Sequence, residues 1–129
     1  MNYDAAWIDA VESAAAGVLG KAYEAGKITI RDSDRLYSRY CEAVEAREIW
    51  RCEAERAKAD ADAAHDDYEH TYDRDEQRAA AAEYKRAKAA RLEALKEYYA
   101  ASEAYRSARA AIAALKDSEE KRNNEQKEQ

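Results

Sequence analysis

Residues 80–115 read AAAEYKRAKAARLEALKEYYAASEAYRSARAAIAAL, and small or aromatic side chains recur in this stretch at alternating spacings of four and three residues. The positions that share the spacing are Ala80, Tyr84, Ala87, Arg91, Ala94, Tyr98, Ala101, Tyr105, Ala108, Ile112 and Leu115. A repeat averaging about 3.5 residues is typical of a coiled-coil seam, slightly tighter than the roughly 3.6 residues per turn of an isolated helix. The stretch therefore predicts a long helix that packs against another helix.

A second seam with the same spacing comes earlier in the chain. It consists of Leu36, Tyr40, Ala43, Arg47, Trp50, Ala54, Ala57, Ala61, Ala64 and Tyr68. The repeat lapses between His70 and Asp75, where Asp73 with Glu76 three residues later is typical of a helix start. The two seams predict an all-α fold built on a long antiparallel alanine/tyrosine-rich coiled-coil hairpin. One uninterrupted helix over 30–116 that associates between chains is the alternative, since no glycine or proline marks the lapse.

We expect helices at about 3–25, 30–70 and 74–116, forming a single helical domain over 1–116. The first helix carries Trp7, Val11 and Leu19 on one face. It is expected to pack at the base of the hairpin, where Leu92, Leu95 and Tyr99 widen the apolar stripe, and so to complete a three-helix bundle. Residues 117–129 contain no apolar side chain and are expected to form a disordered charged tail.

Local signals place the chain reversals. Gly26 is expected to take a left-handed conformation just past the first helix, and Thr29 to cap the second. Within the hairpin, a register in which facing residue numbers sum to 141 pairs Ala43 with Tyr98 and Tyr40 with Ala101. A register that sums to 148 also pairs large side chains with small ones. We prefer 141 because it centres the turn just before Asp73.

Composition limits the classes of protein that the chain can belong to. The 129 residues include no proline and only three glycines, and 39% are charged, which is typical of long helices. Phenylalanine is absent, so alanine and tyrosine must form the core. Such a core buries little apolar area, and we therefore retain a homodimer as the alternative to a monomer.

Cys41 and Cys52 lie eleven residues apart on one predicted helix. That separation is roughly 16 Å, whereas a disulfide needs Cα atoms within about 7 Å. We interpret both cysteines as small hydrophobic residues in a reducing compartment. No apolar run approaches the roughly 20 residues of a membrane span. We therefore expect a cytoplasmic protein without a membrane partner.

Negative charge is concentrated around the predicted turn. Residues 60–76 contain eight acidic residues and one arginine, a net charge of −7 in a chain whose total is −6. We expect the partner-binding site here, formed by Asp60, Asp62, Asp66, Asp67, Tyr68, Glu69, Tyr72, Asp73, Asp75 and Glu76. The alternative is a solvated tip whose charge only keeps the protein in solution. Complementary charge speeds association with a basic surface, and tyrosine is common at interfaces. A direct nucleic-acid partner is not expected, because the whole chain is acidic.

Catalytic and metal-binding signals are weak. His65 and Glu69, like Asp66 and His70, lie four residues apart and could form half of a metal site. The predicted third helix has no histidine to complete it, so we expect neither a metal nor a cofactor. The sequence has no phosphate-binding glycine loop or nucleophile motif. We therefore expect a protein that is not an enzyme.

These features favour a non-enzymatic inhibitor or regulator. Its acidic arm would dock on a basic, nucleic-acid-binding surface of a protein partner by mimicking phosphate charge. Phages and mobile elements often encode such proteins, which act in the host cytosol. The alternative is a structural coiled-coil scaffold or an oligomerisation module, in which the alanine/tyrosine seam is the working surface.

Overall fold

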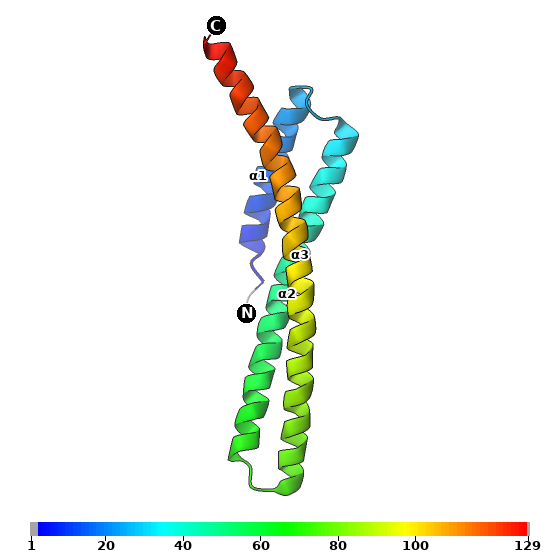
Figure 1. Cartoon of the computed structure of the whole chain (residues 1–129), viewed down its shortest axis with the longest axis vertical. Coiled ribbons are helices and arrows are strands. Elements are labelled where there is room, and N and C mark those ends of the chain that lie inside the picture. Colours follow the sequence, from blue (N-terminus) through cyan, green and yellow to red (C-terminus); the bar gives the residue numbers. More distant parts are fainter. Residues whose placement is uncertain (1–2, 129) are drawn as a thin grey trace. The chain divides into compact units, whose positions relative to one another are not determined.

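The part of the chain that the structure describes forms three α-helices. Helix α1 spans Ala5–Glu24, α2 spans Ile30–His70 and α3 spans Arg74–Glu128 (Figure 1). The computed structural model describes residues 3–128, with side chains as far as Lys116. The described residues contain no strand. The all-α prediction is confirmed, and so is the hairpin, because α2 and α3 run antiparallel on either side of a turn at 71–73.

Short-range hydrogen bonds fix the helix starts. The Asp4 side chain accepts a hydrogen bond from the Trp7 amide at 3.0 Å, and Thr29 Oγ1 accepts one from the Asp32 amide at 3.1 Å. Each oxygen satisfies a donor that has no partner within its own helix. Gly26, just past the end of α1, has a φ of 74°, a conformation that glycine adopts at little cost. The predictions for Thr29 and Gly26 are confirmed.

The end of α3 differs from the prediction. We expected the helix to end near 116 and a disordered tail over 117–129, but the helical backbone continues to Glu128. Loss of apolar residues removes a packing partner without breaking a helix, and no glycine or proline follows Leu115 to stop it. Gln129 lies outside the described residues.

The chain divides into two compact units. We call Ala46–Ala100 the hairpin arm, which contains the second part of α2, the turn and the first part of α3. We call the other unit, Asp4–Glu45 with the chain from Ala101 onward, the three-helix base. Since α2 and α3 both run through the two units, the single domain expected over 1–116 stays a prediction.

All three helices contribute to the core of the base. Its buried members are Ile8, Ala15 and Leu19 from α1, Tyr40, Ala43 and Val44 from α2, and Tyr105, Ala108 and Ile112 from α3. The Tyr105 ring lies at the centre, 6.2 Å from the Trp7 ring and 5.7 Å from the Tyr40 ring. Packing of α1 on both other helices confirms the predicted three-helix bundle.

The surface that α1 covers on α3 is not the one we expected. In the base, α1 packs with Tyr105, Ala108 and Ile112, whereas Leu92 and Tyr99 remain 69% and 61% exposed. The 20 residues of α1 reach only about 30 Å, and the aromatic contacts of Tyr105 fix where the helix docks. The residues of α3 that pack with α1 are therefore not the predicted ones.

Alanine forms the seam of the arm. Its buried hydrophobic residues are Ala54, Ala57, Ala61 and Ala64 on α2 and Ala87 and Ala94 on α3. Small side chains let two helices approach toward the lower end of the usual 8–10 Å, roughly, between axes. Close approach brings backbone and side-chain atoms into dispersion contact, which replaces part of what larger apolar residues would supply.

The aromatic contacts of the hairpin do not follow the preferred register. Tyr40 contacts Tyr105 and Arg47 contacts Tyr98, two pairs whose numbers sum to 145, while His65 contacts Tyr84, a pair that sums to 149. These values lie closer to 148 than to 141, so the preferred register is wrong. The three-residue turn explains the shift, because α2 ends at His70 and α3 begins at Arg74.

Replacing Ile112 with alanine should destabilise the base strongly. Ile112 is 6% exposed in the core, and truncating such a side chain costs about 2–5 kcal/mol of unfolding free energy. The matched control is Ile30→Ala, at a residue 55% exposed at the start of α2, which should cost less than about 1 kcal/mol. Urea unfolding followed by circular dichroism measures both, and equal losses would contradict the assignment of the core.

Candidate functional site

The ten predicted site residues gather at one end of the arm, and we call this group the acidic tip. Asp60, Asp62, Asp66, Asp67, Tyr68 and Glu69 lie in the last turns of α2, Tyr72 and Asp73 in the turn, and Asp75 and Glu76 in the first turn of α3. All ten are exposed. The turn is in the lower part of Figure 1.

Two members of the acidic tip hold the turn together. Asp73 Oδ1 accepts hydrogen bonds from the amides of Asp75 at 2.8 Å and Glu76 at 3.2 Å, so Asp73 caps α3 as predicted. Thr71 Oγ1 donates to Glu76 Oε2 at 3.0 Å, and Gln77 Nε2 donates to the Thr71 carbonyl at 2.8 Å. The turn thus presents its side chains from a hydrogen-bonded frame that needs no glycine.

Two histidines lie among the acids. His70 Nδ1 contacts the Asp66 carbonyl at 2.8 Å and Asp66 Oδ1 at 3.3 Å. The hydrogen bond to the backbone carbonyl, followed by the Asp66 charge, raises the pKa of His70 above 6.5. His65 Nε2 lies 3.5 Å from Glu69 Oε1, and its ring is 5.4 Å from the Tyr84 ring. Asp66 and Glu69 therefore face histidines on their own helix.

The remaining carboxylates are turned to solvent. Among residues whose side chains are described, Asp60, Asp62, Asp67 and Asp75 make no ion pair and accept no hydrogen bond. Basic residues on α3 do not reach them, since Arg86 pairs with Glu83 and the Lys88 ammonium lies 5.2 Å from the Tyr84 ring centre. Acids at a helix C-terminus also oppose the helix dipole. The tip therefore carries a high density of negative charge, and this charge lowers the local stability of the helix end.

Aromatic side chains interrupt this charge. Tyr72 is 98% exposed in the turn and Tyr68 is 46% exposed on α2. A shallow hollow at the tip is lined by Asp67, His70, Thr71, Glu76, Ala79, Ala80 and Glu83. Within the described residues, no three histidine, cysteine or acidic side chains are placed to hold a metal ion. The tip offers charge and aromatic surface to a partner.

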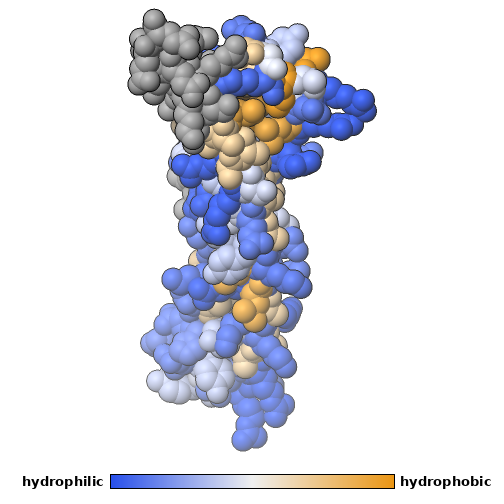
Figure 2. All heavy atoms as spheres, turned by 45° about the horizontal axis from the view of Figure 1, so that its top comes forward, coloured by the Kyte–Doolittle hydropathy of each residue, from blue (hydrophilic) through white to orange (hydrophobic). Residues whose placement is uncertain are grey.

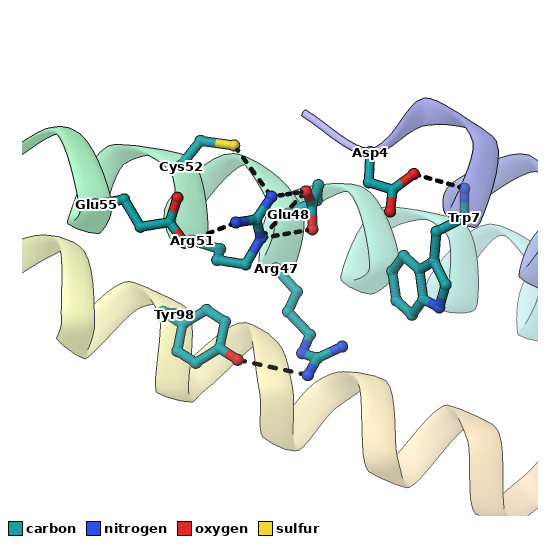
Figure 3. Close-up of polar contacts among 8 residues, drawn as sticks. All are labelled: Asp4, Trp7, Arg47, Glu48, Arg51, Cys52, Glu55 and Tyr98. Carbon is teal, nitrogen blue, oxygen red and sulfur yellow. Dashed lines mark hydrogen bonds and ion pairs between the residues drawn. The ribbon is translucent and has the colours of Figure 1, made fainter. Parts of the chain in front are cut away.

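Further along the arm, α2 carries a polar network that the sequence reasoning missed. The Arg51 guanidinium pairs with Glu48 and with Glu55, the latter at 2.8 Å (Figure 3). Glu48 is only 5% exposed, and its hydrogen bonds raise the pKa of Arg51 further above its ordinary value. The spacing of Glu48, Arg51 and Glu55 could have predicted these ion pairs, because the three positions share one side of a helix. Nothing in the sequence marked Glu48 as buried.

The side chain of Arg47, a charged residue in the seam of α2, contacts α3. The guanidinium lies 5.7 Å from the ring centre of Tyr98 and donates to the Tyr98 hydroxyl at 3.4 Å (Figure 3). This contact connects α2 with α3 inside the arm.

The base contains a small polar cluster around Cys41. Burial, followed by the charge of Glu45, raises the pKa of Glu12, and burial also raises the pKa of Cys41. A raised pKa keeps the Cys41 thiol protonated, which lowers its reactivity as a nucleophile. Cys41 and Cys52 are both free thiols. The cluster therefore indicates a packing role for Cys41.

Comparisons with protein-family models, with curated proteins and with solved structures found no match. Across the residues that the structure describes, no helix has an apolar stretch long enough to cross a membrane. The acidic tip must therefore be interpreted from its own geometry and charge.

Removing the cap at Asp73 should loosen the tip. Asp73→Ala leaves two amides of α3 without a side-chain acceptor and should lower the unfolding free energy by about 1 kcal/mol. Asp73→Asn keeps an acceptor oxygen and should retain most of the stability. Thermal unfolding compares the variants, and an equal loss in both would show that the side-chain oxygen does not cap the helix.

The pKa of His70 should lie above 6.5, the ordinary value for histidine, in an NMR titration. Its stabilising contact should be fully present below that ordinary value and lost as the pH rises through the raised one. Asp66→Asn removes the carboxylate charge but keeps the carbonyl acceptor, so the pKa of His70 should fall only part of the way. A pKa unchanged in this variant would show that the Asp66 charge makes no contribution.

Proposed function

We propose that the protein is a non-enzymatic inhibitor or regulator that docks its acidic tip on a basic surface of a protein partner. The observation that carries the proposal is the set of exposed, unpaired carboxylates of Asp60, Asp62, Asp67 and Asp75 at one end of the arm. An isolated solvating surface needs no such concentration of like charge. Opposing charge on a partner would offset the repulsion that the tip carries when it is alone.

The partner surface is proposed to be one that binds nucleic acid. Such surfaces are basic because they neutralise phosphate groups, and they are therefore complementary to regularly spaced carboxylates. From Asp60 to His70 α2 rises by about 15 Å, so its acids are spread along several turns of the helix. We place the protein in the cytoplasm and in the class of inhibitors that phages and mobile elements encode.

Tyr72 and Tyr68 are proposed to give the docked complex its lifetime. Charge mainly speeds the encounter of two proteins, whereas buried aromatic side chains at an interface mainly slow dissociation. Tyr72 is 98% exposed and can be buried fully by a partner. Aromatic rings in the middle of an acidic surface would then distinguish a specific partner from any basic protein.

A scaffold or oligomerisation module is the second candidate function. Leu92 and Tyr99, 69% and 61% exposed on the arm, favour it because large apolar residues are rarely left together at a helix surface without a partner. Light scattering separates the two candidates. An elongated higher oligomer supports the scaffold, and a monomer or dimer with an accessible tip supports the inhibitor.

Affinity capture tests the docking of the acidic tip. The triple variant Asp60→Asn, Asp67→Asn and Asp75→Asn removes three unpaired charges, and we expect its association rate with a captured partner to fall about tenfold. Nucleic acid should compete for the partner, and rising salt should weaken the complex. Asp9→Asn, Asp34→Asn and Glu103→Gln form the matched control, because they remove the same charge from exposed positions in the base.

Two results would overturn the proposal. One is binding to the partner that is insensitive to salt. The other is an equal loss of association rate in the triple variant and in its control, because the effect would then belong to the net charge of the chain and not to the tip.

A further inference from the structure

The base carries an open hollow between α1 and α3, and we call it the base groove. Its volume is about 340 Å³, within the roughly 300–1,000 Å³ that is usual for small-molecule sites. Its apolar lining consists of Val11, Ala14, Ala15 and Val18 of α1 and Ile112 and Ala113 of α3. Every residue that lines it belongs to the base. In the space-filling view, apolar residues reach the surface between hydrophilic side chains (Figure 2).

Small side chains keep the base groove open. Ala14 on α1 and Ala113 on α3 are both exposed, and a methyl group is too short to fill the space beside its neighbours. Val11 and Val18 are only partly buried against the core. Since apolar surface gains free energy when it leaves water, this floor favours an occupant with an apolar body.

Two basic side chains border the apolar floor. Arg109 and Lys116 lie seven residues apart on α3, about 10 Å along the helix. Among the described side chains, neither makes an ion pair or a hydrogen bond. The chain has 28 acidic and 22 basic residues, yet no described acidic side chain lines this groove. Glu12 of α1 interacts instead with Cys41 and Glu45 of α2. The groove is therefore locally positive in an acidic protein.

Tyrosine side chains join Arg109 in the lining of the base groove. Tyr40 and Tyr105 both line it, and their ring centres are 5.7 Å apart. Burial, followed by the neighbouring Tyr105, raises the pKa of Tyr40 to about 12, whereas the charge of Arg109 acts to lower it. The Tyr40 hydroxyl thus stays protonated, and the Arg109 guanidinium lies near enough to act on it. A guanidinium and a protonated hydroxyl are both hydrogen-bond donors suited to a carboxylate.

We propose that the base groove binds a small amphipathic carboxylate, a molecule with an apolar chain that ends in a carboxylate group. The chain lies on the floor between α1 and α3, and Arg109 and the Tyr40 hydroxyl hold the carboxylate. A wholly polar anion would leave the floor in water, an uncharged apolar molecule would leave the guanidinium unpaired, and a cation would be repelled. Binding here does not involve the acidic tip, whose residues lie in the arm.

Isothermal titration calorimetry of the full chain with decanoate, below its critical micelle concentration, tests the site. We expect saturable binding, and binding of decanol at least about tenfold weaker, because the alcohol keeps the apolar chain and lacks the charge. Arg109→Gln should weaken decanoate binding by a similar factor. Arg35→Gln is the matched control, because Arg35 is an exposed arginine of the base that does not line the groove. Its affinity for decanoate should equal that of the wild type.

A variant that fills the hollow tests where the apolar chain lies. The larger side chain in Ala14→Leu would occupy the space assigned to the ligand and should weaken decanoate binding at least about tenfold. Ala16→Leu is the matched control, at a residue exposed on α1 but outside the groove. Leucine is a good helix former, so circular dichroism should show that both variants keep their helices.

Three results would overturn the inference. The first is the absence of saturable decanoate binding to the wild-type chain. The second is equal affinity for decanoate in Arg109→Gln and its control, and the third is equal affinity in Ala14→Leu and its control. The triple variant of the acidic tip should bind decanoate as the wild type does, so this site and the docking of the tip can fail separately.

Discussion

Close approach of two alanine-rich helices is the constraint on which the arm depends. Ala54, Ala57, Ala61 and Ala64 on α2 meet Ala87 and Ala94 on α3, and no larger buried hydrophobic residue separates the helices there. Stability must therefore come from backbone proximity and from contacts at the few large side chains, such as Arg47 over Tyr98. Since so little apolar area lies inside, the outer faces are free to carry charge and exposed aromatic rings.

Features set by local chemistry were predictable from the sequence. Asp73, Thr29 and Gly26 act within three residues of their own position, so their roles follow from residue type and spacing. The ten residues of the acidic tip could be placed together for a similar reason, because a turn brings the end of one helix next to the start of the following one. The exposure of the eight acidic residues followed from their charge.

Features set by packing between helices were not predictable in the same way. Alanine facing alanine carries almost no size information, so the register could not be read from the seam and came out nearer 148 than 141. The contact surface of α1 was decided by Tyr105, whose ring meets both Trp7 and Tyr40, and the sequence did not single out that tyrosine among ten. The burial of Glu48, which pairs with Arg51, was not marked in the sequence either. The continuation of α3 to Glu128 shows that polar composition alone does not stop a helix.

The distribution of tryptophan gives each unit its own intrinsic optical reporter. The chain has two tryptophans: Trp7, packed near Tyr105 in the base, and Trp50, half-buried on α2 in the arm. The tryptophan emission of a Trp7→Phe chain would come only from the arm, and that of a Trp50→Phe chain only from the base. Fluorescence of the two chains would then show whether α2 and α3, which run through both units, make the molecule melt in one cooperative step or let the alanine seam open first.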